Sequence, residues 1–212
     1  MAGFHFAASI VVMGISPKQF EALQERTRPG QRKVSKSSTD IDRTTTHEVI
    51  LGIDPSLRGT GYGVIKVTQP HPETLAQGTI KCPPSWEHSR CLAQIAKTIR
   101  SVIRKTRPTG CVVEGIFHAQ NLKTAIIMGE ARGAALASAG EAGLEIFELA
   151  ARKVKLAIVG YGGAQKSAVA RMVQRMLDLE EEPAPDEADA LGLALAYAQE
   201  NRRYQLQPPK RV

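Results

Sequence analysis

A regular pattern of hydrophobic and polar positions begins near Glu48 and continues to about residue 200. Its first part consists of short apolar runs with strand-like spacing. Three of these runs follow one another with short connections, which favours an antiparallel meander. They are EVILGID (48–54), GYGVIKVT (61–68) and TLAQGTIKC (74–82). Two later runs have the more continuous apolar character of buried strands, CVVEGIF (111–117) and LEIFELA (144–150).

Apolar residues recur every three or four positions between and after the later strands. The clearest segment is 89–106, where the apolar positions from Leu92 to Ile103 share one side of a helix that Pro108 ends. Further helices are predicted over 119–143, 164–179 and 186–200. Small residues in the first of these indicate a close contact with another helix: Gly129, Gly133, Ala134 and Ala135.

The predicted element order is β-β-β-α-β-α-β-α-α. A strand followed by a helix and another strand implies a parallel pair with a right-handed crossover. We therefore predict an α/β domain over 48–201, with a mixed five-stranded sheet and helices on both faces. Residues 27–46 are polar and poor in large apolar side chains, so 1–47 is expected to be a disordered basic extension. Residues 202–212 are expected to be a basic C-terminal tail.

The chain's net charge of +7 is concentrated at its two ends. Residues 1–47 carry a net charge of +3 and residues 202–212 a net charge of +4, which leaves 48–201 neutral. Basic ends attract polyanions without reading their sequence, but they are also common as plain solvated tails. Charge alone therefore does not establish nucleic-acid binding.

The sequence has neither a membrane-spanning segment nor the cysteine spacing of a zinc site. No stretch of about 18 apolar residues occurs, and the apolar first fourteen residues lack the basic start of a secretory signal. The three cysteines show no CxxC spacing, and their odd number does not suit a disulfide framework. We expect a cytoplasmic protein without membrane contact.

Four acidic residues stand where strands and helices end or begin. Asp54 closes the first strand and Glu114 the fourth, and neighbouring strands would place both at one edge of the sheet. Asp186 and Asp189 open the last helix and share one face of its first turn. Each aspartate also has a structural explanation, because Asp-Pro initiates turns and aspartate suits helix N-termini. Glu114 is harder to explain structurally, because an unpaired acid in an apolar strand is costly to bury.

Convergence of these four carboxylates would create a site for hard divalent cations. Carboxylates at close range repel one another unless a cation lies among them. Oxygen ligands without histidine or cysteine favour Mg²⁺, with Mn²⁺ as a substitute. Two such ions about 3.5–4 Å apart suit the hydrolysis of a phosphodiester bond.

Two further features are compatible with phosphate binding. Gly59, Gly61 and Gly63 follow Asp54 closely and either cradle a phosphate with backbone N–H groups or form a hairpin turn. Lys155 and Lys166 precede the acidic helix and either contact phosphates or belong to a solvated basic segment.

Together, five segments in this order resemble the RuvC family of Holliday junction resolvases, over about residues 48–200. They are GIDPSLRGTGYGVI (52–65), VVEGIFHAQN (112–121), ARGAALASA (131–139), ELAARKVKLAIVGYGGAQKSAVARMV (148–173) and PDEADALGLALA (185–196). The resemblance implies an RNase H-like fold and a Mg²⁺-dependent endonuclease that resolves four-way junctions by paired symmetric nicks in recombination and repair.

The resemblance also implies roles for individual residues and partners. Asp54, Glu114, Asp186 and Asp189 fall on the metal-binding catalytic acids, which hold two ions. Phe117 falls on an aromatic that stacks on bases at the crossover, and Lys155 and Lys166 fall on DNA-contacting lysines. The family acts as a homodimer with the RuvAB branch-migration complex.

The sequence departs from the family pattern at a few positions, and rival functions remain to be tested. Ser56 stands where a glycine usually follows Asp-Pro, His118 follows Phe117 where an apolar residue is common, and residues 1–47 have no counterpart. The main alternative is an RNase H-like ribonuclease that processes precursor rRNA. A non-enzymatic junction-binding protein is a third hypothesis, and the chain's length disfavours a small-molecule phosphotransferase.

Overall fold

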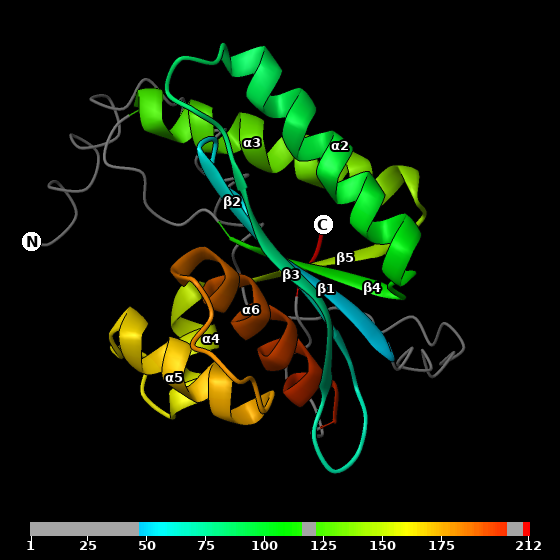
Figure 1. Cartoon of the computed structure of the whole chain (residues 1–212), viewed down its shortest axis with the longest axis vertical. Coiled ribbons are helices and arrows are strands. Elements are labelled where there is room, and N and C mark those ends of the chain that lie inside the picture. The colour runs from blue at the N-terminus through cyan, green and yellow to red at the C-terminus, as the bar shows by residue number, and fades with distance from the viewer. Residues whose placement is uncertain (1–46, 116–121, 203–209) are drawn as a thin grey trace, which may run out of the picture. The chain divides into compact units, whose positions relative to one another are not determined.

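The computed structural model describes residues 47–115, 122–202 and 210–212 (Figure 1). Of the predicted N-terminal extension, 1–47, only His47 is among the described residues, so its expected disorder lies outside them. Phe117 and His118 also lie outside the described residues. The strands are β1 (Val49–Asp54), β2 (Gly59–Lys66), β3 (Glu73–Lys81), β4 (Gly110–Glu114), β5 (Glu145–Leu149) and β6 (Lys210–Arg211). The helices are α2 (His88–Thr106), α3 (Leu122–Glu141), α4 (Ala151–Val159), α5 (Lys166–Met176) and α6 (Pro185–Arg202).

The strands form one mixed sheet in the order β3-β2-β1-β4-β5-β6. The first three strands pair in antiparallel fashion, whereas β1, β4 and β5 run parallel to one another. The predicted meander and the predicted parallel crossovers are both confirmed. Because Ile53 of β1 is level with Val113 of β4, the next residues along the two strands, Asp54 and Glu114, reach the same edge of the sheet.

Helices cover both faces of the sheet, as predicted. On one face, α2 buries Ile95 and Ile99 beside the small residues Ala131 and Ala135 of α3. On the other face, α6 lies along the sheet and α4 and α5 pack against α6 (Figure 1). The apolar core is thus divided into two layers, one on each side of the sheet.

Glycines in β1 and β2 let helix α6 approach the sheet closely. A Cβ atom added at Gly52 would collide with the carbonyl oxygen of Ala190, and one added at Gly61 would collide with that of Asp186. A Cβ at Gly63 would lie 2.7 Å from side-chain atoms of Leu191. These three glycines make room for α6, the helix that carries Asp186 and Asp189. For Gly61 and Gly63, this role differs from both predicted roles, a phosphate cradle and a hairpin turn.

We expect Gly52→Ala to lower the free energy of unfolding by about 1–3 kcal/mol, because the methyl group has no space beside the α6 backbone. Gly140→Ala on α3 is a matched control, since nothing lies within 4 Å of its added Cβ. Urea unfolding of both variants measures the difference. Equal stability of the two variants would contradict close packing of α6 on the sheet.

Two elements of the fold are absent from the predicted element order. Helix α4 lies in the basic segment after β5, where only Val154 and Ile158 are buried, and Gly160 ends it with a φ of 79°. Strand β6 places the end of the expected basic tail on the edge of β5, where Arg211 pairs with Glu145 at 2.9 Å. Across the described ranges, no helix combines the length and hydropathy that a membrane span requires.

Candidate active site

The centre of the site is formed by two carboxylates on adjacent strands. Asp54 is the last residue of β1, and its carboxyl group is hydrogen-bonded to that of Glu114 at the end of β4. Burial raises the pKa of Asp54 to about 8, and the hydrogen bond to Glu114 and the charges of Glu114 and Asp189 act in the same direction. Burial is the largest of these effects, and the charge of Lys166 acts in the opposite direction.

Lys166 supplies a positive charge at the site. Its Nζ donates a hydrogen bond to Oδ2 of Asp189 over 2.6 Å. This bond is the main cause of a raised pKa of Lys166, and the charges of Asp189, Asp54 and Glu114 add to it while burial opposes it. The ammonium group thus faces three of the four acids.

The fourth acid, Asp186, approaches the same edge of the sheet from the other side of β1. Its Oδ2 lies 3.0 Å from the position of a Cβ at Gly59, the first residue of β2. Helix α6 begins at Pro185, so Asp186 is the second residue of the helix and not its N-cap. The strand order places β1, with Asp54, between β2 and β4.

The structure therefore brings Asp54, Glu114 and Asp189 together, and it places Asp186 beside Gly59 and Gly61 of β2, next to β1. Within the part of the chain that the structure describes, no three carboxylate, imidazole or thiol groups lie close enough together to hold one metal ion. This finding agrees with the observed contacts, since Asp189 binds the Lys166 ammonium and Asp54 and Glu114 bind each other.

A cavity of about 110 Å³ opens beside the acids. Its wall contains two acids and two lysines, together with apolar side chains of α4, α5 and α6. The charged residues are Glu114, Asp189, Lys155 and Lys166. The two predicted lysines are thus placed next to the carboxylates, although they belong to different helices. Opposite charges around one small cavity suit a substrate that carries a phosphate group and accepts metal coordination.

Comparison with known proteins identifies this arrangement. The family model for crossover junction endodeoxyribonuclease RuvC matches residues 50–197, which include all four acids. The chain belongs to the RuvC family. RuvC of Vibrio vulnificus strain CMCP6 is 43% identical over 154 residues, which cover 73% of this chain and 88% of that protein. RuvC of Akkermansia muciniphila is 43% identical over 148 residues, which cover 70% of this chain and 89% of that protein.

Solved structures support the same assignment. Thermus thermophilus RuvC in complex with a Holliday junction substrate superposes with a TM-score of 0.72 at 33% identity. The match covers 78% of this chain and all of that chain. The expected RNase H-like fold of the RuvC family is confirmed.

One charged pair that supports the RuvC-family site is not apparent from the sequence pattern. Arg132 of α3 donates to the backbone oxygen of Glu114 over 3.4 Å and to Oε2 of Glu148 on β5 over 2.5 Å. The side chains of Arg132 and Glu148 are only 14% and 19% exposed. The arginine therefore ties the end of β4 to α3 and β5 and helps to fix Glu114. The one available signal is Glu148 itself, which is an acid inside the apolar run LEIFELA.

Proposed function

We propose that this chain is a structure-selective endonuclease that resolves Holliday junctions by paired symmetric nicks in recombination and repair. The observation that carries the proposal is the placement of Asp54, Glu114 and Asp189 beside two lysines, with Asp186 in the first turn of the helix that carries Asp189. The choice of DNA is supported by Thermus thermophilus RuvC, whose matching structure is a complex with a Holliday junction substrate.

The four acids are suited to divalent cations, and we propose that two Mg²⁺ ions bind there, with Mn²⁺ as a substitute. The donors are carboxylate oxygens alone, which hard cations prefer. The raised pKa of Asp54 is due first to burial and then to Glu114 and Asp189, whose negative charge Lys166 only partly offsets. Bound ions supply a more acidic water and stabilise negative charge on the leaving oxygen.

The chain's own residues position the DNA. Lys155 and Lys166 line the cavity beside the acids, where their ammonium groups attract the phosphate to be cut. Lys166 also competes with a cation for Asp189, because both bind the same carboxylate. Phe117, which lies outside the described residues, is proposed to stack on bases at the crossover.

A homodimer is part of the proposal, since two equivalent sites match the near two-fold symmetry of a four-way junction. The contact surface that we propose is the open side of α3. Leu122 and Ile126 are 77% and 53% exposed there, and nothing lies within 4 Å of a Cβ added at Gly129 or Gly133. The chain's own helices leave these glycines open, which suits the close approach of a second α3.

Replacing Ile126 with glutamate should weaken the dimer at least about tenfold, because the charge would be buried at the centre of the contact. Leu156→Glu on α4 is the control, as Leu156 is similarly exposed (58%) on another helix. Sedimentation equilibrium of both variants provides the measurement. A dimer that tolerates I126E as well as L156E would exclude α3 as the interface.

Family membership supports the RuvAB branch-migration complex as partner and the cytoplasm as location, and both belong to the proposal. The proposed substrate is tested by comparing a synthetic four-way junction, a linear duplex and a structured RNA at equal concentration. We expect Mg²⁺-dependent nicking of the junction above all. Preferred cleavage of RNA would support the rival ribonuclease and overturn the proposal.

A further inference from the structure

The outer face of helix α2 carries a continuous row of basic side chains. It is formed by Arg90, Lys97, Arg100, Arg104 and Arg107, the last of which is the C-cap residue, and all five are exposed. At 100° per residue they fall within about 100° of the helix circumference, and they span about 25 Å along the axis. We refer to these five residues as the α2 stripe.

Little negative charge opposes the stripe. Helix α2 contains no aspartate or glutamate between His88 and Thr106. Arg100 pairs with Glu141 at 2.7 Å, and Arg90 lies 3.9 Å from the ring centre of Trp86. Lys97, Arg104 and Arg107 form no ion pair with another described residue. Because the domain over 48–201 is neutral overall, this concentration of charge is a local feature of the surface.

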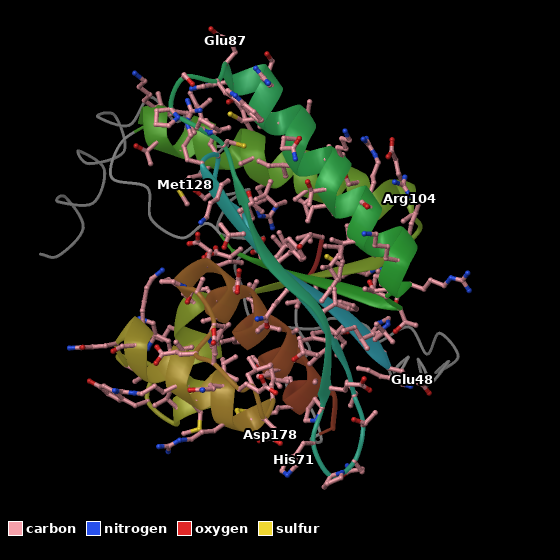
Figure 2. The ribbon with its side chains drawn as sticks, viewed as in Figure 1. Glu48, His71, Glu87, Arg104, Met128 and Asp178 are labelled. Carbon is pink, nitrogen blue, oxygen red and sulfur yellow. The ribbon has the colours of Figure 1, made fainter. Side chains whose placement is uncertain are left out.

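The stripe lies apart from the catalytic edge. Helix α2 ends just before β4 begins, whereas Glu114 stands at the other end of β4. The stripe therefore leads away from the acids, on the face of the sheet opposite α4, α5 and α6 (Figure 1). Figure 2 shows Arg104 at the outer rim of the molecule, pointing away from the sheet.

The chemistry of the stripe favours phosphate over a protein partner. Four of its five members are arginines, whose planar guanidinium groups bind phosphate oxygens in pairs. Ala93 is the one exposed apolar residue among them, so the stripe lacks the large anchors that protein interfaces bury. A row of cations about 25 Å long matches the regular charge of a nucleic-acid backbone.

We propose that the α2 stripe binds the phosphate backbone of a DNA duplex arm outside the active site. This inference rests on the proposed function, because it takes DNA to be the substrate. The contact would read no sequence and would raise the affinity for junctions whose arms are long enough to reach it.

The test compares Lys97→Gln/Arg104→Gln with Arg171→Gln/Arg175→Gln, a control that removes the same charge from exposed positions on α5. Binding to a junction with arms of about 25 base pairs is measured across a salt series. We expect the stripe variant to bind about tenfold more weakly, with the slope of log K against log salt reduced by about 2. The control should bind within about twofold of the unmodified protein. Unchanged binding by the stripe variant, or an equal loss in the control, would overturn the proposal.

Cleavage of a junction with short, hairpin-closed arms of about 8 base pairs separates this inference from the proposed function. The stripe variant should cleave this substrate at the unmodified rate, which also shows that it is folded. Loss of that cleavage would mean that the stripe serves the active site, which contradicts a separate surface. If the unmodified protein nicks no junction, the proposed function fails, whereas the salt-dependent comparison of binding still tests the stripe.

Discussion

Replacing Asp54 with asparagine should abolish junction cleavage and leave junction binding nearly unchanged. Asp54 is hydrogen-bonded to Glu114 on β4, and the charge of Asp189 on α6 acts on it as well. Asparagine has almost the same shape but offers one neutral oxygen, so the cluster loses charge that divalent cations need. We expect the single-turnover rate to fall at least about 1,000-fold, which corresponds to about 4 kcal/mol in activation free energy.

Asp178→Asn provides the matched control for this experiment. Asp178 is exposed beyond the end of α5, and its φ of 51° is one that asparagine adopts readily. Figure 2 shows Asp178 well away from α3 and the start of α2. The control should cleave at the unmodified rate, and binding of both variants is measured in EDTA. Cleavage by D54N at more than about a tenth of the control rate would exclude Asp54 from the catalytic acids.

The same substitution should stabilise the protein when divalent cations are removed. The folded state raises the pKa of Asp54 from 3.8 to about 8, so it holds this proton more tightly than the unfolded chain does. The corresponding stability is fully present below about pH 4 and is lost as the pH rises through about 8. Asparagine does not titrate, so the free energy of unfolding of D54N should exceed that of the unmodified protein by up to about 5 kcal/mol at pH 8 and by less than about 1 kcal/mol at pH 4.

Urea unfolding in EDTA at several pH values measures this difference. Added Mg²⁺ should stabilise the unmodified protein more than D54N, since a ligand that binds the folded state raises stability according to its affinity. D178N again serves as the control and should follow the unmodified protein at every pH. A pH-independent difference between D54N and the unmodified protein would contradict the raised pKa of Asp54 in the folded protein.

The sheet and most of the helices could be predicted because their signals are local. Residues 89–106 show helical spacing that matches α2, and the acids at the ends of β1 and β4 follow directly from strand order. Helix α4 was not predicted, because only Val154 and Ile158 are buried and its basic residues are equally typical of a solvated loop. Strand β6 has two residues, which is too few to show a period.

Contacts between distant segments could not be predicted from pattern alone. The hydrogen bond from Lys166 to Asp189 joins two helices, and that from Arg132 to Glu148 joins a helix to a strand. Gly52 and Gly61 look the same in sequence whether they cradle a phosphate, form a turn or seat a helix. Only the tertiary structure distinguishes these roles, because the atom that a Cβ would strike belongs to α6.

Mapping the cuts on all four strands of an end-labelled mobile junction, with Mg²⁺ and with EDTA, tests the central claim most directly. We predict nicks at matched positions on two opposite strands when Mg²⁺ is present, and intact strands in EDTA. Equal cutting in EDTA, or cuts scattered without symmetry over the four strands, would contradict a pair of cation-dependent carboxylate sites that resolve the junction.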